Sequence, residues 1–492
     1  MPRLPLLASL SLFVFCSAAV ARATPPIDPA AMDRTYERLG KAFVDAGKTD
    51  ALSIAVVDHG KVRYYNIGTL VPGKPDAPTE RTVYEIGSIT KVFTSLLLAQ
   101  AVVQHRAKPD DDLRRYLPGP YPNLVYQGTP VRLVDLADTT SALPDNLPDI
   151  GKLAVGVSPD RVPLVATKAL ATYDRTRMFA DLATAQLSAR PGTTPRHSNL
   201  ASILLAVAVE KALGASYEVL LDRYIEKPFG MGRGVGHARD DSLAVGYDAE
   251  HRPLPPLDAP YVASAGGLRY STQDMARFIL GELNAADPAI ALSQRVAWGD
   301  PDGDAVAYNW KVDTAIDGKR RLRASGGTFG FSSYVEIYPD EAYGVVLLAN
   351  RPGSVQSELQ ALAEQARLDM LGKPAAQTAL ESALAKSDFH DFASTVASVR
   401  GEHPELHLSE SKVNDWAYSL LKAKKAAEAI GVFRYNVDRW PKSWNAWDSL
   451  AEGYETTGDP SKAIENYRRS LALNPANAHA LERLKVLEAA KP

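Results

Sequence analysis

The sequence predicts an α+β fold in which helices flank one antiparallel sheet, followed by a small all-α domain. Strand-like runs occur at residues 51–68 and again at residues 305–348, and mainly helical sequence with Pro/Gly-rich loops lies between them. From residue 375 onward the strand signal stops and a helical repeat begins. A sheet built from both ends of a domain, with a helical middle, is typical of α+β proteins.

The strands of the sheet are expected where apolar alternation is bounded by turn residues. Residues 51–57 alternate as a buried strand does, Asp58-His59-Gly60 turns the chain, and residues 61–68 complete a hairpin. A helix at residues 357–371 is expected to close the domain. The remaining predicted strands are residues 305–312, 320–325, 331–338 and 343–348.

The first 23 residues have the layout of a secretory signal peptide. A positive start at Arg3 precedes an apolar run over residues 4–20, and Ala21-Arg22-Ala23 is a small-x-small cleavage site. Cleavage would also remove Cys16, the single cysteine, and with it any disulfide or thiol chemistry. We therefore expect a periplasmic or secreted protein with no integral membrane segment after cleavage.

The C-terminal part contains an internal repeat with a spacing of 34 residues. Its matching positions are Ala417, Ala429, Phe433 and Pro441, which recur as Ala451, Ala463, Tyr467 and Pro475. The pattern resembles tetratricopeptide repeats, which are helix-turn-helix units with small residues at the helix contacts and proline at the exit. Two copies are few for a free-standing array, so residues 378–399 or the main domain are expected to cap the stack. The alternative interpretation is an amphipathic helical hairpin that packs on the main domain and binds no partner.

Composition and length set the domain plan and the kinds of partner. The 492 residues carry a formal net charge of −3, which gives no electrostatic footprint for nucleic acid. The histidines show no metal-ligand spacing, and no Gly-rich strand-to-helix turn indicates a nucleotide, so the sequence predicts no metal and no cofactor. The predicted parts are a signal peptide (residues 1–23), a main domain (24–372), a helical linker (373–410) and the repeats (411–492).

The strongest chemical signal is a Ser-x-x-Lys motif formed by Ser88 and Lys91. The apolar spacing that follows predicts a buried helix, with Ser88 in its first turn and Lys91 one turn later on the same face. An apolar environment would lower the pKa of Lys91, and a neutral amine beside a serine hydroxyl can accept its proton. The motif alone is weak, because a helix N-cap followed by a snorkelling lysine gives the same pattern.

Further segments occur in the order typical of one enzyme family. They are Asp110 to Pro118, Leu136 to Pro144 and Ala265-Gly266-Gly267-Leu268. Over residues 33–371 the chain resembles the beta-lactamase-related serine hydrolases, which include class C beta-lactamases, D,D-peptidases and related esterases. The resemblance implies a Ser-Lys acyl-enzyme mechanism with Ser88 as the nucleophile.

The second motif of this family is changed at one position. The family has Tyr-x-Asn at the start of a helix, where this chain has His197-Ser198-Asn199. The family tyrosine is thought to share the role of base with the lysine, so the resemblance implies a catalytic role for His197; the alternative is a polar helix-start residue. An imidazole has an ordinary pKa of about 6.5 and can accept a proton at neutral pH. Asn199 matches the amide that positions substrate in the family.

The third motif has lost its cation. The family has Lys-Thr-Gly or His-x-Gly on the strand that lines the site, where this chain has Ala324-Ser325-Gly326, followed by Gly327. The resemblance implies an oxyanion hole formed by the backbone N–H groups of Ser88 and Gly327. It also implies that Ser325 and Gly326 lie at the substrate.

Two functions of different classes follow. The first is an active hydrolase of esters or amides; the loss of the cation at Ala324 disfavours substrates with a carboxylate, such as beta-lactams and D-alanyl-D-alanine ends. Arg323 is adjacent to that position, but alternate strand residues face opposite sides, so it is not expected to replace the cation. The second is a catalytically weakened scaffold whose repeats bind a protein partner. The intact Ser88, Lys91 and Asn199 favour the first.

Overall fold

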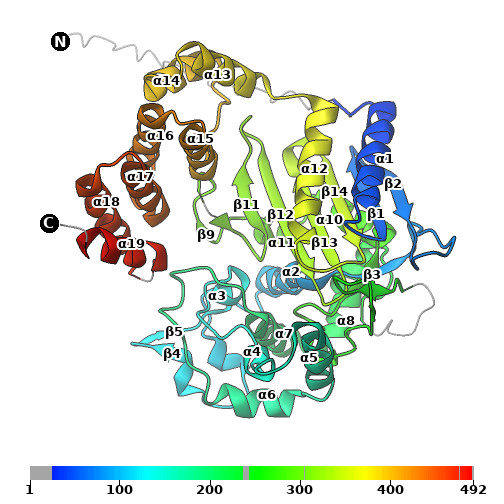
Figure 1. Ribbon diagram of the computed structural model, residues 1–492. Coiled ribbons are helices and arrows are strands. Elements are labelled where there is room, and N and C mark those ends of the chain that lie inside the picture. The colour runs from blue at the N-terminus through cyan, green and yellow to red at the C-terminus, as the bar shows by residue number, and fades with distance from the viewer. Residues whose placement is uncertain (1–24, 236–242, 304, 476, 490–492) are drawn as a thin grey trace, which may run out of the picture.

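The computed structural model describes residues 25–235, 243–303, 305–475 and 477–489. The predicted signal peptide and Cys16 lie outside these described residues. A central sheet with helices on both faces forms the main domain, and the C-terminal helices form an arc along one side of it (Figure 1). The fold is therefore the α+β arrangement predicted from the sequence, followed by an all-helical region.

Eight antiparallel strands form the sheet of the main domain. They are β1 (Ala51–Asp58), β2 (Lys61–Gly68), β9 (Trp298–Gly299), β10 (Ala305–Val306), β11 (Lys311–Thr314), β12 (Arg320–Gly327), β13 (Ser332–Tyr338) and β14 (Tyr343–Ala349). Their order in space is β2-β1-β14-β13-β12-β11-β10-β9. The N-terminal hairpin pairs with the last strand, with Ile54 opposite Leu347, so the two ends of the domain meet in one sheet.

The predicted strand at residues 305–312 is wrong. The chain forms two short strands there, β10 and β11, which pair through a turn in which the N–H of Ala307 donates to the carbonyl oxygen of Trp310. Asn309 has a φ of 61°, a left-handed conformation that asparagine tolerates, so the alternating sequence folds back on itself. The other predicted strands and the closing helix begin and end within two residues of the observed elements.

Two helices cover one face of the sheet. These are α1 (Pro29–Asp45) and α12 (Val355–Leu371), which pack together and on β2, β13 and β14. Their apolar side chains form a buried layer with the strands that includes Tyr36, Leu347 and Leu359. Because helices cover both faces of the sheet, every residue of β13 and β14 is buried.

Helices on the other face hold the larger core. Helix α10 (Thr272–Glu282) packs on β1 and β14, and α11 (Pro288–Ser293) packs on α2 (Thr90–Val103). The rings of Phe93 and Phe278 stack there with centroids 4.0 Å apart. Nearly every residue of α2 is buried, which is the environment that the sequence predicted for this helix.

A helical region lies in the sequence between β3 (Val83–Glu85) and β8 (Arg269–Ser271). Its central helix is α7 (Asn199–Leu213), which packs on α2. Among the described residues, no single helix has the length and apolarity to span a membrane. Helix α7 and the segment Tyr217–Phe229 meet these criteria only when taken together, and they are bent by 74° relative to each other. The shorter helices are α3 (Leu133–Ala137), α4 (Ile150–Leu153), α5 (Val162–Ala171), α6 (Arg175–Leu182), α8 (Tyr217–Leu221) and α9 (Lys227–Phe229).

Three two-stranded sheets support the loops. They are β3 (Val83–Glu85) with β8 (Arg269–Ser271), β4 (Val125–Tyr126) with β5 (Thr129–Pro130), and β6 (Gly246–Tyr247) with β7 (Pro253–Leu254). In the first of these, the buried Glu85 and Arg269 form an ion pair at 3.2 Å. Since β3 leads directly into α2, this pair anchors the start of that helix.

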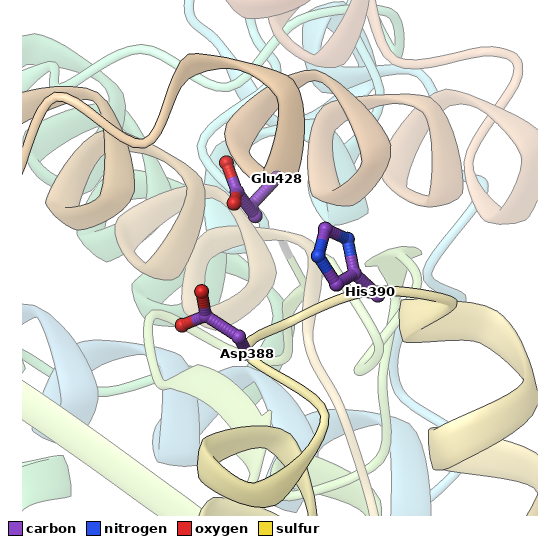
Figure 2. A group of neighbouring side chains, drawn as sticks. All are labelled: Asp388, His390 and Glu428. Atoms are coloured by element: carbon purple, nitrogen blue, oxygen red, sulfur yellow. The ribbon is translucent and has the colours of Figure 1, made fainter.

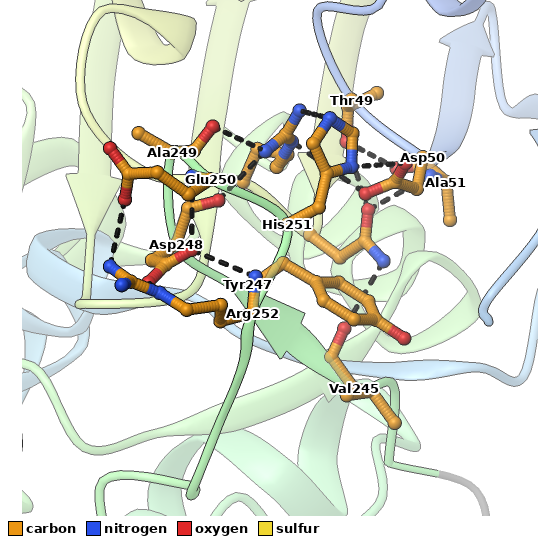
Figure 3. A network of polar contacts seen from close by, with 12 residues as sticks. Thr49, Asp50, Ala51, Val245, Tyr247, Asp248, Ala249, Glu250, His251 and Arg252 are labelled. Carbon is orange, nitrogen blue, oxygen red and sulfur yellow. Dashed lines mark hydrogen bonds and ion pairs between the residues drawn. The ribbon is translucent and has the colours of Figure 1, made fainter. Parts of the chain in front are cut away.

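A polar network fixes the segment that follows β14 (Figure 3). The buried Arg351 donates through Nη1 to the carbonyl oxygen of Asp248, 2.7 Å away, in the β6–β7 hairpin. Its Nε lies 3.6 Å from Asp50 Oδ2, and His251 Nδ1 lies 3.2 Å from Asp50 Oδ1. The network therefore joins the hairpin to the start of β1.

Seven helices form the C-terminal arc within the described residues 375–475 and 477–489. They are α13 (Ala375–Lys386), α14 (Phe392–Glu402), α15 (Glu410–Lys422), α16 (Ala426–Arg439), α17 (Trp444–Thr456), α18 (Pro460–Leu473) and α19 (Ala478–Ala489). The repeat positions Ala417 and Ala451 are fully buried at the helix contacts. Helix α14 packs on α16, at the end of the stack where a cap was expected. Arg439 reaches Asp302 of the main domain at 3.0 Å and ties the two parts together.

Candidate active site

Ser88 lies in a single 3₁₀ turn, Gly87–Ile89, that joins β3 to α2. Gly87 has a φ of 51°, and a Cβ on it would lie 2.4 Å from the backbone nitrogen of Gly327 in β12. No other residue type could occupy that position without displacing the strand. The absence of a side chain at Gly87 therefore lets β12 reach the turn that presents Ser88.

Lys91 lies beside Ser88, with Nζ 2.8 Å from Oγ. Its side chain is buried at 5% exposure, and Nζ also donates to Asn199 Oδ1 and to the carbonyl oxygen of Ala265, each at 2.7 Å. Burial lowers the pKa of Lys91 to about 7, against the opposing field of Asp145. An ammonium with so low a pKa exchanges its proton readily at neutral pH.

His197 is held between Ser88 and an acidic side chain. Its Nε2 lies 3.2 Å from Ser88 Oγ, and its Nδ1 lies 2.8 Å from Asp145 Oδ1. It immediately precedes Ser198, the N-cap of α7, so the start of that helix sets its position. Burial opposes the ionisation of Asp145, but hydrogen bonds from His197 and from the N–H of Asn199 keep the pKa of its carboxyl below the usual value.

Three further groups at the site, Asp145, Asn146 and the carbonyl of Ala265, were not predicted from the sequence. Asn146 Oδ1 accepts from Asn199 Nδ2 at 2.9 Å and so fixes the orientation of that amide. Asp145 and Asn146 directly follow the family-like segment Leu136 to Pro144, and this position in the sequence could have marked them as candidate site residues. Nothing local shows that this loop meets the start of α7, because that contact exists only in the folded chain.

Strand β12 passes directly against the turn that holds Ser88. A Cβ on Gly326 would lie 2.0 Å from the carbonyl oxygen of Ile86 and 2.8 Å from the backbone nitrogen of Ser88. Ser325 is exposed on the same strand, and Ala324 is partly buried. Of the predicted site residues, Ser88, Lys91, His197 and Asn199 are joined by hydrogen bonds, and Gly326 and Gly327 contact the same turn.

Arg323 points away from this cluster. Its Nε donates to Asp313 Oδ2 at 2.8 Å, and its Nη1 donates to Gln360 Oε1 of α12 at 3.3 Å. The guanidinium therefore lies on the face of the sheet that α12 covers. Arg323 does not replace the cation that is absent at Ala324.

A separate group of potential metal ligands lies in the C-terminal helices (Figure 2). One ligand atom each from Asp388, His390 and Glu428 lies within 4.8 Å of the others. Asp388 and His390 are exposed, and Lys425 forms an ion pair with Asp388. Because that lysine already satisfies the carboxylate, we assign no metal to this group.

The fold and the Ser-Lys cluster have the arrangement expected for the beta-lactamase and transpeptidase class of proteins. A family model of beta-lactamases matches residues 36–369, and a tetratricopeptide-repeat model matches residues 444–487. The chain therefore belongs to the beta-lactamase family and carries a C-terminal tetratricopeptide repeat.

The chain is similar to several characterised proteins at low sequence identity. The chain is 27% identical over 358 residues to the D-alanyl-D-alanine-carboxypeptidase/endopeptidase AmpH of Escherichia coli strain K12, which covers 69% of this chain and 90% of AmpH. It is 26% identical over 362 residues to a beta-lactamase of Pseudomonas fluorescens, covering 65% of this chain and 92% of that protein. A solved class C beta-lactamase superimposes with a TM-score of 0.59 at 20% identity, over 72% of this chain and 100% of that one. At this identity, the similarity to the solved structure shows only that the two proteins share a fold.

Proposed function

We propose that this protein hydrolyses an ester or amide through an acyl-enzyme intermediate on Ser88. The observation that carries the proposal is the contact of 2.8 Å between Ser88 Oγ and the Nζ of the buried Lys91. A serine hydroxyl is a weak nucleophile until a neighbouring group takes its proton. Lys91 Nζ and His197 Nε2 both lie within hydrogen-bond distance of Ser88 Oγ, so either nitrogen could take this proton.

The oxyanion would be stabilised by the backbone N–H groups of Ser88 and Gly327. The close approach of β12 to the turn at Gly87 supports this assignment, because it brings the Gly327 nitrogen against the residue that precedes the nucleophile. Donors fixed in a backbone need no rearrangement when the carbonyl oxygen becomes negative. Asn199, whose Oδ1 accepts from Lys91, and the exposed Ser325 would contact the substrate.

The substrate class follows from the missing cation. With alanine at position 324 and Arg323 bound to Asp313 on the far face, β12 offers no positive side chain to a substrate carboxylate. We therefore expect neutral acyl esters or amides to be better substrates than beta-lactams or peptides ending in D-alanyl-D-alanine.

Activity-based labelling tests the proposal. A fluorophosphonate should label Ser88 of the full chain, and Ser88→Ala and Lys91→Ala should each abolish labelling. The mature protein should hydrolyse short-chain nitrophenyl esters faster than nitrocefin. Absence of labelling and of ester hydrolysis in the folded wild-type protein would refute the acyl-enzyme proposal.

The alternative function is a scaffold whose repeat region binds a protein. The tetratricopeptide match supports a role in binding, whereas the hydrogen bonds among Ser88, Lys91 and Asn199 favour catalysis. If Ser88→Ala leaves the cellular phenotype unchanged while removal of residues 411–492 abolishes it, the scaffold is the correct function.

We infer export to the periplasm or the medium from the predicted leader. The mature protein should then begin at Thr24, which N-terminal sequencing of the native protein would test. An N-terminus at Met1 in the purified native protein would contradict it.

A further inference from the structure

We propose that Asp145 makes His197 the proton acceptor for Ser88, so that the site works as a Ser-His-Asp arrangement in which Lys91 donates a hydrogen bond to Ser88 Oγ. This inference rests on the proposed function and specifies which nitrogen takes the proton. It rests on the chain of contacts from Asp145 through His197 and Ser88 to Lys91. Along this series of contacts, the hydrogen of each hydrogen bond can be assigned to one donor.

The assignment starts at the carboxylate. An ionised carboxylate accepts hydrogen bonds and donates none, so the proton between Asp145 Oδ1 and His197 Nδ1 belongs to the ring nitrogen. In a neutral imidazole the other nitrogen then carries a lone pair. That lone pair is on Nε2, which is the atom that faces Ser88 Oγ at 3.2 Å.

The hydroxyl then determines the state of Lys91. Ser88 has one proton, which it donates to His197 Nε2, so the contact from Lys91 Nζ must be a donation to Ser88 Oγ. The other two neighbours of Nζ are Asn199 Oδ1 and the Ala265 carbonyl oxygen, both of which are acceptors. An ammonium has three N–H donors, and three acceptors surround this one.

The reaction balances on these groups. The proton of Ser88 passes to His197 Nε2 as Oγ bonds to the substrate carbonyl carbon, and the carbonyl π electrons move to its oxygen. When these electrons return, the bond to the leaving group breaks and the leaving group takes the proton from Nε2. A water molecule then loses a proton to Nε2 and bonds to the acyl carbon, and Ser88 Oγ leaves and recovers that proton. Asp145 is a positioning residue that keeps the ring in the required tautomer.

The experiment compares Asp145→Asn in two backgrounds, wild type and His197→Tyr. In the wild-type background, Asp145→Asn should lower kcat for a nitrophenyl ester by on the order of 10²- to 10⁴-fold, with KM changed less than about threefold, as for loss of the acid in Ser-His-Asp enzymes. A phenol at position 197 has no ring nitrogen, so it has no tautomer for Asp145 to select. In that background, the same substitution should therefore change kcat less than about threefold.

Two controls make the result specific. Asp149→Asn removes an exposed carboxylate from the same loop. This carboxylate caps the N-terminus of α4 and does not contact His197, so the substitution should leave kcat unchanged. Nitrogen NMR of the wild-type ring should show the proton on Nδ1 of His197, and Asp145→Asn should shift that signal. An equal loss of kcat from Asp145→Asn in both backgrounds, or no loss in either, would overturn this inference. Absence of Ser88 labelling in the wild-type protein would instead refute the proposed function itself.

Discussion

Gly326 contacts the nucleophile turn so closely that a Cβ on it would lie 2.8 Å from the backbone nitrogen of Ser88. Its neighbour Gly327 has the opposite orientation, because a Cβ there would meet only the end of the Gln356 side chain. Adjacent strand residues face opposite sides of a sheet, so two consecutive glycines have different constraints.

This difference predicts opposite outcomes for two matched substitutions. Gly326→Ala would press a methyl group against Ile86 and Ser88, displace β12 from the turn and lower kcat by about 10²-fold, the scale of losing one oxyanion donor. Gly327→Ala only requires the Gln356 side chain to move, so its kcat should remain within about threefold of wild type. Ester hydrolysis by the two purified variants tests this, and equal loss in both would show that the strand is not limited by contact with Ser88.

The pH dependence follows from Lys91. Its pKa is lowered to about 7, so the ammonium loses its proton as pH rises through this value. If the charged form holds Ser88 Oγ while His197 takes the proton, kcat/KM should fall as pH rises above about 7. The groups that face Nζ are Ser88, Asn199 and the Ala265 carbonyl, with Asp145 as the nearby charge that favours the ammonium. A rise in kcat/KM through pH 7 would assign the base role to Lys91 instead.

Restoring the cation on β12 should change substrate choice. Ala324→Lys would place an ammonium at the position that is usually Lys or His in the family motif that the third segment resembles, and a charge-assisted contact should raise kcat/KM for nitrocefin by about tenfold. Neutral nitrophenyl esters make no such contact, so their kcat/KM should not rise. The ratio of the two rates is the measurement, and an equal change for both substrates would mean that position 324 does not face the substrate carboxylate.

A substitution in the core of the C-terminal helices should lower the stability of these helices without lowering the rate of ester hydrolysis. Phe433 is fully buried in their core, and Phe433→Ala should cost about 3–5 kcal/mol of the free energy of unfolding of this region. Urea unfolding followed by circular dichroism measures the shift, and Val486→Ala on the exposed surface is the control. Nitrophenyl ester hydrolysis should be unchanged; a parallel loss of hydrolysis would show that the arc supports the active site.

Sequence patterns were sufficient to predict contacts between residues that are close in the chain. Ser88 and Lys91 are three residues apart, so one helical turn brings them together whatever the rest of the chain does. The strand and helix patterns predicted the α+β fold and the repeat for the same reason. The failure at residues 305–312 came from a reversal at Asn309, because alternation continues on both sides of a short turn and does not reveal it.

The amino-acid sequence by itself identified Ser88 as the candidate nucleophile, Lys91 as its neighbour and Ala324 in place of a cation, since each is defined by residue type and short spacing. Only the tertiary structure decided that Asp145 meets His197 and that β12 lies against Ser88. Those contacts join segments far apart in the chain, and their geometry depends on how α2, α7 and the sheet pack together rather than on any pattern within one segment.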